Sequence, residues 1–423
     1  MSIDEHPKIL IISNSSMRDR SQTAITLRNI FQNWPREKLM ELSTSDAVSG
    51  SSKIAYYSLP NIRQPFATLA KTKFVRKVNI EMKKSCNRKI GAQNISLKHD
   101  IRQWLFSIID RSPLLLVRDD FEAIKSFAPN VVYTMGSSVT QMKLAIRVAT
   151  TFKIPIIPHF MDNWPESIQW QSNHLLRGYR KSLDYWLKRV YEHTRCALTI
   201  SDEMAAEYER VTGVKHIALM NSIDCDYWGC TVKDPGSEIL FVYAGGLHLN
   251  RESVLLEIAE RLDMVSRKVK KACLMRVYTN SEPALLQTTK NWRSIKILKS
   301  VPNENLKEIY NSADVLILVE SLDSNKSLEV FTKYSISTKT AEYLATGKPI
   351  LYIGPAERTL TKYLKQNNVA TVITDCENLS DAMEKIVLEL GDSRILDSVL
   401  LARKNHNQKN LNSILLHAIE LNF

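Results

Sequence analysis

The chain has 423 residues, of which 44% are hydrophobic and 24% are charged, a composition typical of soluble globular proteins. This length exceeds one ordinary hydrophobic core, so we expect two domains. No stretch approaches the roughly 18–20 apolar residues that span a bilayer, and the acidic start MSIDEHPK does not resemble a secretory signal. The formal net charge of +12 indicates an anionic partner: nucleic acid, an acidic membrane surface or a phosphate-bearing substrate.

Cysteine usage predicts a reducing, cytoplasmic compartment. The six cysteines are scattered and show no CxxC spacing, so neither a zinc site nor a disulfide framework is expected. They are Cys86, Cys196, Cys225, Cys230, Cys273 and Cys376.

Short β-rich apolar runs alternate with helical patterns along the whole chain. In the first half they are residues 8–14, 54–59, 130–136, 154–162, 196–201 and 216–220; after a polar, Gly/Pro-containing stretch they are 239–246, 273–279, 295–301, 315–320, 349–354 and 368–373. Continuous Val/Ile/Leu runs between helices predict parallel strands covered on both faces. Two such sets predict an α/β protein with two doubly wound domains. The expected division is a first domain at 1–225, a linker at 226–238, a second domain at 239–395 and C-terminal helices at 396–423.

The segment Lys71–Lys89 carries eight Lys/Arg and a single acid, Glu81. Phe74, Val78 and Met82 repeat at helical spacing, so a basic helical insertion at about 71–99 is expected. It could lie on an anionic membrane surface or grip a phosphorylated acceptor; it could equally be an ordinary solvated basic helix. The cations of interest are Lys73, Arg76, Lys77, Lys83 and Lys84.

A Ser/Thr cluster precedes a helix expected to begin near Thr338, in the sequence SISTKTAEYLATGKP. Free N–H groups at such a start suit a phosphate, and Lys339 adds a full positive charge. Glu342 lies one turn further, within reach of a sugar hydroxyl or ribose. A well-capped surface helix would give the same pattern. Gly347 fits the C-terminal stop.

Two further loops follow predicted strands. In FVYAGGLHLNR, Gly245 and Gly246 permit close backbone approach to a ligand and Arg251 could clamp a diphosphate; the pattern is no GxGxxG fingerprint. In IPHFMDNWP, His159 and Asp162 could transfer a proton or orient a hydroxyl, and Trp164 could stack on a sugar. The plain alternatives are a tight turn in the first loop, and a buried histidine with a capping aspartate in the second.

Together these segments resemble the GT-B glycosyltransferases, in particular the retaining family 4 group of bacterial surface-polysaccharide pathways. The matching pieces, spread over nearly the whole chain, are KILIISN, PNVVYTMGSSV, PIIPHFMDNWP, LTISDEMAAEYERVTG, NSID, FVYAGGLHLNR, VPNENLKEIYNSADVLI and residues 334–355. The resemblance implies two Rossmann-like domains facing a cleft, with a nucleotide-sugar donor held by the second. The acceptor, lipid-linked or glycan, approaches from the first domain, and a C-terminal helix crosses back to it.

The resemblance also implies residue roles. Arg251 and Lys339 would neutralise the donor diphosphate and Glu342 would bind ribose. His159 and Asp162 would face the transferred sugar. The remaining donor-side positions are Gly245, Gly246, Asn250, Val301, Pro302, Ser337 and Thr338. In front-face departure the leaving phosphate helps to deprotonate the acceptor, so cationic stabilisation of the leaving group is the main electrostatic demand.

Two departures from the family pattern stand out. Many members carry a pair of glutamates separated by seven residues; here Glu342 is the second, but the first position is Tyr334, and neither Glu320 nor Glu329 has the required spacing. The loop after the first strand, SNSSMRDRSQTA, lacks the glycines often seen there. Arg18 and Arg20 would then contact phosphate or acceptor, or the loop is simply looser.

No metal or other cofactor is expected, because the only DxD-like triplet, Asp224–Asp226, falls at the domain junction. The expected activity is a metal-independent glycosyltransferase, cytoplasmic or peripheral on the inner face of the plasma membrane. A non-catalytic nucleotide-sugar-binding protein and a nucleotide-sugar epimerase remain as alternatives. Nucleic-acid binding is the weakest interpretation, because the basic residues are not interleaved with side chains that could stack on bases.

Overall fold

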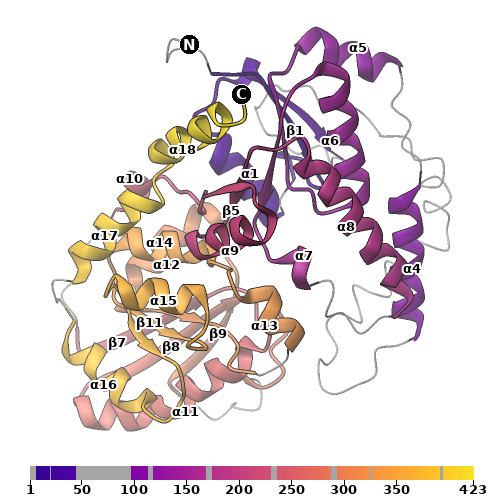
Figure 1. Ribbon diagram of the computed structural model, residues 1–423. Helices are drawn as coiled ribbons and strands as arrows, with labels where there is room; N and C mark the ends of the chain where they lie inside the picture. Colours follow the sequence, from indigo (N-terminus) through magenta and orange to yellow (C-terminus); the bar gives the residue numbers. More distant parts are fainter. Residues whose placement is uncertain are drawn as a thin grey trace. The chain divides into compact units, whose positions relative to one another are not determined.

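The computed structural model describes residues 6–19, 21–43, 97–112, 118–167, 174–229, 236–286, 293–323, 326–390 and 394–423. It divides into two compact units, residues 1–220 with 411–423 and residues 221–410. The sequence-based division instead placed its linker at 226–238 and assigned all of 396–423 to the C-terminal helices. Each unit is a parallel sheet with helices around it (Figure 1).

The first unit has a six-stranded parallel sheet in the order β2-β1-β3-β4-β5-β6. The strands are β1 (Ile9–Ser13), β2 (Leu39–Ser43), β3 (Val131–Thr134), β4 (Ile156–Phe160), β5 (Cys196–Thr199) and β6 (Lys215–Ala218). The helices are α1 (Gln22–Phe31), α4 (Leu97–Arg111), α5 (Arg118–Phe127), α6 (Val139–Phe152), α7 (Trp164–Ser167), α8 (Arg177–Tyr191), α9 (Asp202–Thr212) and α18 (Gln408–Glu420).

The helices of the first unit cover both faces of its sheet, as the continuous apolar strands require. One core joins β1 to α1 and α18, which contributes Leu411, Leu415, Ala418 and Ile419. The other core joins the opposite face to α5, α6 and α8. The last helix therefore packs into the first unit although its chain arrives from the second.

The second unit repeats this design with the strand order β12-β11-β10-β7-β8-β9. Its strands are β7 (Glu238–Ala244), β8 (Ala272–Thr279), β9 (Ile295–Lys299), β10 (Val315–Val319), β11 (Ile350–Ile353) and β12 (Thr371–Ile373). Its helices are α10 (Cys225–Trp228), α11 (Arg251–Val269), α12 (Leu306–Ser312), α13 (Lys326–Thr332), α14 (Thr338–Thr346), α15 (Thr359–Gln366), α16 (Leu379–Leu388) and α17 (Arg394–Asn405).

The predicted α/β class with two doubly wound sheets is confirmed, and the apolar runs other than 54–59 coincide with strands. The run 54–59 lies outside the described residues. Among the strands that the structure describes, the sequence did not reveal β2, because its run LMELS is interrupted by Glu41, which is fully buried. None of the described helices has the length and hydropathy of a transmembrane span.

Candidate functional site

The strand order of the second unit fixes where a ligand site is expected. The chain runs from β7 outward to β8 and β9, then returns to the other side of β7 as β10. Ligands of doubly wound sheets bind outside the carboxyl ends of the strands at such a switch point. The residues that follow these two strands are Gly245-Gly246 after β7 and Glu320 after β10. The glycine pair thus lies where the fold predicts a site.

Lys339, in the first turn of α14, lies directly against Gly245. A Cβ atom added at Gly245 would collide with the Nζ and Cε atoms of Lys339, so glycine is what admits the amine. The same Nζ lies 5.5 Å from the ring centroid of Tyr243, on β7. Burial and, after it, the charge of the Arg251 guanidinium lower the pKa of Lys339 to about 8, so two cations act on each other here.

The loop after Gly246 brings Arg251 to this cluster. Gly246 has no Cβ, and the space that a Cβ would fill holds the imidazole of His248. Leu249 and Asn250 adopt left-handed φ angles of 60° and 55°, which bend the chain into the start of α11 at Arg251. Burial, and then the charge of Arg251, lower the pKa of His248. The charges of Arg251 and Lys339 therefore both act on this loop, an environment that suits an anion.

Besides bending the chain, Asn250 makes a hydrogen bond: its side-chain amide donates to Asp323 Oδ2 at 2.7 Å. Asp323 follows β10, so this hydrogen bond ties the loop after β7 to the loop after β10. The Tyr243 hydroxyl adds a bond within the first loop, donating to the Gly246 carbonyl oxygen at 2.7 Å. These bonds hold the glycine turn in place on the carboxyl edge of the sheet.

Glu342 lies one helical turn beyond Lys339 and is held by a tyrosine that the sequence did not single out. The Tyr310 hydroxyl, on α12, donates to Glu342 Oε2 at 3.0 Å. Trp228 stacks on the Tyr310 ring with centroids 5.4 Å apart. Burial raises the pKa of Glu342 to about 7, and the Tyr310 hydrogen bond and Lys339 offset only part of that effect. No spacing signal links Tyr310 to Glu342, because 32 residues separate them.

The helix of Lys339 begins at Thr338, as predicted, and the side chain of its N-cap residue does not cap it. Ser337 is the N-cap residue, and its side chain makes no capping hydrogen bond. Gly347 ends the helix with φ 64°, in the left-handed conformation that glycine favours. Because the Ser337 side chain does not cap the helix, the first N–H groups of α14 are left for another acceptor.

The position of the missing glutamate is filled by a buried ring. Tyr334 is 2% exposed, with the Lys333 Nζ atom 4.6 Å from its ring centroid. A different carboxyl lies at the switch point: Glu320 is 9% exposed and accepts from the Tyr352 hydroxyl at 3.1 Å. Burial raises the pKa of Glu320, and the charges of Arg358 and Arg251 oppose that rise in part.

The remaining positions expected on the donor side lie at a different strand. Val301 and Pro302 follow β9, the edge strand of the second sheet; Val301 is partly buried and Pro302 is exposed. The Asp224–Asp226 triplet forms structural contacts: Asp224 caps α10 through the amides of Asp226 and Tyr227, and Asp226 pairs with Arg403 at 3.0 Å.

In the first unit, His159 is buried in β4, and its Nδ1 lies 2.6 Å from the Tyr133 hydroxyl. Burial lowers the pKa of His159 to about 3, which the Leu219 backbone only partly offsets, so the ring is neutral at physiological pH. Asp162 is exposed just beyond the strand end. Trp164 packs against the core beside Phe160, with ring centroids 6.2 Å apart.

The loop after β1 is fixed by a carboxyl from the neighbouring strand. Glu41 is fully buried and accepts from the Met17 amide at 2.7 Å and from the Ser16 hydroxyl at 3.0 Å. Burial raises the pKa of Glu41 to about 7. Arg18 lies in this loop. Arg20 lies outside the described residues, as do Lys73, Arg76, Lys77, Lys83 and Lys84.

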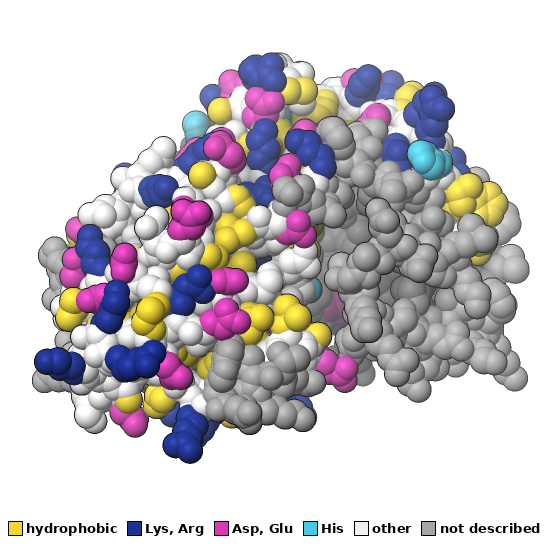
Figure 2. All heavy atoms as spheres, turned by 90° about the horizontal axis from the view of Figure 1, so that it is seen from below, with side chains coloured by type: hydrophobic (Ala, Val, Ile, Leu, Met, Phe, Trp, Pro, Cys, Tyr) yellow, Lys and Arg dark blue, Asp and Glu magenta, His cyan; other side chains and the backbone are white. Residues whose placement is uncertain are grey.

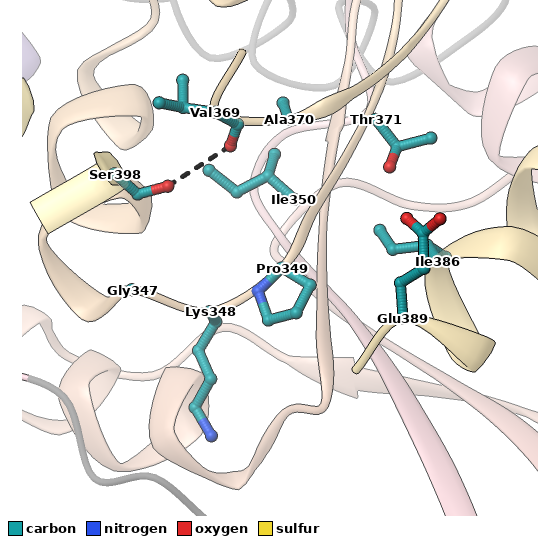
Figure 3. Close-up of a pocket in the computed structure, with 10 residues that line it drawn as sticks. All are labelled: Gly347, Lys348, Pro349, Ile350, Val369, Ala370, Thr371, Ile386, Glu389 and Ser398. Atoms are coloured by element: carbon teal, nitrogen blue, oxygen red, sulfur yellow. Dashed lines mark hydrogen bonds between the residues drawn. The ribbon is translucent and has the colours of Figure 1, made fainter. Parts of the chain in front are cut away.

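Two hollows in the second unit lie away from the cation cluster. The one in Figure 3 lies where β11 and β12 begin, which is the opposite edge of the sheet, and its volume of about 20 Å³ suits little more than a water molecule. The second opens beyond the ends of β10, β11 and β12, between Arg261, Leu322, Ala356 and Asp375. Neither contains Lys339, Arg251 or Glu342.

Comparison with solved structures identifies the architecture. HepE of Anabaena in complex with UDP superposes with a TM-score of 0.61 at 9% identity, over 98% of this chain and 99% of that one. Sucrose-phosphate synthase of Thermosynechococcus elongatus gives 0.61 at 11% identity, over 97% and 98% of the chains. The chain has the GT-B glycosyltransferase fold.

A third GT-B structure extends the comparison. WaaG, a glycosyltransferase involved in lipopolysaccharide biosynthesis, gives a TM-score of 0.56 at 11% identity, over 96% of this chain and 98% of that one. No family model matches the sequence, and no curated protein matches it either. The GT-B relationship is therefore expressed in the fold of the chain far more than in its sequence.

Proposed function

We propose that this GT-B protein is a glycosyltransferase that moves a sugar from a nucleotide-diphosphate sugar to a lipid-linked or polysaccharide acceptor, with retention of configuration and without a metal. The observation that carries the proposal is the meeting of Lys339, Gly245 and Arg251 beyond the end of β7. Two cations near a glycine turn on the carboxyl edge of a doubly wound sheet suit the diphosphate of such a donor.

The chemistry follows from this charge. The bond between the anomeric carbon and the β-phosphate oxygen breaks, and a bond from the anomeric carbon to the acceptor oxygen forms. In front-face transfer the departing phosphate oxygen takes the acceptor proton, so no protein base is required. Lys339 and Arg251 stabilise the negative charge that develops on the diphosphate, the role that a divalent cation fills in other transferases.

Glu342 and Tyr310 complete the donor site in this proposal. The carboxyl of Glu342 accepts from the ribose hydroxyls, and the Tyr310 hydroxyl, 3.0 Å away, keeps it oriented. The amides at Ser337 and Thr338 contact phosphate, Asn250 holds the glycine loop, and Val301 and Pro302 border the base. His159 and Asp162 face the transferred sugar, while Arg18 and Trp164 serve the acceptor.

Two neighbours support the choice of substrates to test. HepE was solved with UDP and with UDP-glucose, so UDP-sugars come first, followed by GDP-, ADP- and dTDP-sugars. WaaG takes part in lipopolysaccharide biosynthesis, which makes a lipid-linked glycan the first acceptor class. We propose that the protein works at the inner face of the plasma membrane, where such acceptors are presented.

The test is release of nucleoside diphosphate from each donor, with and without acceptor, followed by the anomeric configuration of the product. We expect acceptor-dependent release with one donor, retention at the anomeric carbon, and no loss of rate with a chelator. Lys339→Met should lower kcat/KM about 100-fold, since it removes a charge that is needed most in the transition state. Donor binding without release on any acceptor would favour the non-catalytic alternative.

A further inference from the structure

Two segments from opposite ends of the second unit run side by side. They are residues 221–224, which begin the unit, and residues 405–408, which lie near its end. The amide of Ile223 donates to the His406 carbonyl oxygen at 2.9 Å, and the amide of Gln408 donates to the Ile223 carbonyl oxygen at 3.2 Å. Because these bonds form a parallel bridge, we call the two segments the paired segments. Each holds the backbone of the other in place.

The side chain of His406 adds a third link between the paired segments. The ring is fully buried, with Nδ1 2.9 Å from the Asn221 carbonyl oxygen and Nε2 3.1 Å from the Tyr363 hydroxyl, on α15. A carbonyl oxygen can only accept, so Nδ1 donates to it and Nε2 accepts from the hydroxyl. The side-chain amide of Asn405 donates to the same hydroxyl oxygen at 3.1 Å. Burial lowers the pKa of His406 to about 4, although the bond to Asn221 opposes that shift, so the ring is neutral at physiological pH.

The Asn221 side chain extends this network to the start of α14. Its amide is buried and donates to the Ile336 carbonyl oxygen at 3.1 Å. Ile336 immediately precedes Ser337, the N-cap residue, and Lys339 follows three positions after Ile336. Helices α10 and α17, which adjoin the paired segments, both pack against α14, and α17 lies beside it in Figure 1. The backbone that carries Lys339 is therefore held from the paired segments.

The positions of the anion-binding groups matter because surface charge alone does not select an anion. On the face drawn in Figure 2, Lys and Arg are interspersed with Asp and Glu. Such a mixed surface does not concentrate anions. A diphosphate must therefore be bound by groups at defined positions, and groups that are already in place bind more tightly because they need no rearrangement.

We propose that Asn221 is a positioning residue of the donor site. It holds the backbone before α14 so that the first N–H groups of that helix and the Lys339 amine meet the donor diphosphate. Asn221 itself contacts no substrate. His406 acts behind it, by fixing the backbone from which the Asn221 side chain projects. The inference rests on the proposed function, in which the diphosphate binds at Lys339.

The test measures the binding of inorganic pyrophosphate to the full-length protein by titration calorimetry, because pyrophosphate carries the diphosphate without the unidentified base and sugar. Asn221→Ala should raise Kd about tenfold, since the Ile336 carbonyl oxygen loses its donor and the segment shifts. Asn221→Asp keeps the size of the side chain but donates only while its carboxyl is protonated. Its Kd should approach that of the unaltered protein at pH 5 and exceed it about tenfold at pH 8. A role in packing alone would not produce this pH profile.

A double variant tests whether Asn221 acts through the start of α14. In that case Asn221→Ala should cost less affinity in the Lys339→Met background than in the unaltered protein. The matched control for stability is Ile386→Val, which removes one methylene group from the core of the second unit. It should lower Tm slightly and leave the Kd for pyrophosphate unchanged.

An unchanged Kd for Asn221→Ala would overturn the inference, as would losses of affinity that simply multiply in the double variant. So would a rise in Kd for Ile386→Val as large as that for Asn221→Ala, since affinity would then follow stability alone. No binding by the unaltered protein, or an unchanged Kd for Lys339→Met, would contradict the proposed donor site instead. The two proposals therefore fail separately.

Discussion

At the scale of single residues, the proposed chemistry depends most on Lys339. Its amine lies against Gly245 and over the Tyr243 ring, near a second cation. These surroundings are costly for a positive charge, and burial accordingly lowers the pKa of Lys339 to about 8. A bound diphosphate would repay that cost. We therefore propose that this lysine holds an anion.

This arrangement predicts a pH dependence of binding. The diphosphate attracts the protonated amine, so affinity for a nucleoside diphosphate should be highest below the pKa of Lys339, which is about 8, and fall above it. Between pH 7 and pH 9 we expect Kd to rise about tenfold, corresponding to ~1.4 kcal/mol. Isothermal titration of the protein with UDP at these pH values measures the change. Lys339→Met should bind weakly with little slope; a slope equal to that of the unaltered protein would assign the titration elsewhere.

At the scale of elements, single residues determine the positions of two loops, one after β7 and one after β1. The turn after β7 depends on Gly245, where a Cβ would overlap the Lys339 side chain. The loop after β1 depends on Glu41, which reaches across from β2 to Met17 and Ser16. In each case, a residue on a regular strand or directly after it determines where a functional loop can lie.

Gly245→Ala tests the turn after β7. The added methyl group must displace the amine of Lys339, so we expect nucleotide affinity to fall about tenfold, ~1.4 kcal/mol, with only a small loss in Tm. Gly236→Ala is the matched control, because a Cβ there meets no atom within 4 Å. Equal affinities for the two variants, measured by titration calorimetry, would show that the amine is not held at Gly245.

Glu41→Gln tests the role of Glu41 in the loop after β1. The pKa of Glu41 is about 7 in the folded protein against 4.5 for the ordinary group, so the folded state keeps a proton that the unfolded state has released. The free energy of unfolding should therefore decrease as pH rises from about 4.5 to 7 and stay lower above that. Glutamine does not titrate, so the free energy of unfolding of the variant should not show this decrease. Relative to the unaltered protein, it should therefore rise by ~2–3 kcal/mol between pH 5 and pH 8. Urea unfolding at both pH values measures this, and parallel curves would contradict it.

At the scale of the whole molecule, sequence periodicity predicted most of the architecture, because buried parallel strands are continuous apolar runs. Strand β2 escaped notice because a buried glutamate interrupts its run. The boundary between the units also differs, since α17 packs with the second unit and most of α18 with the first. Packing partners of helices depend on contacts distant in sequence, which periodicity does not encode.

Some residues of the candidate site could likewise be predicted from the sequence, and others could not. Gly245, Arg251, Lys339 and Glu342 could be singled out because each stands near a strand end or a helix start. Tyr310 could not, because its link to Glu342 exists only after α12 and α14 have packed on the sheet.

The central claim is that the diphosphate of the donor binds at Lys339 in the second unit. The most direct measurement is isothermal titration of the protein with UDP, GDP, ADP and dTDP, repeated for Lys339→Met and for Lys365→Met, an exposed lysine of α15. We expect one nucleotide to bind clearly best, with Kd raised at least about tenfold by Lys339→Met and unchanged by Lys365→Met. If Lys339→Met retained the full affinity for that nucleotide, the donor site would lie elsewhere.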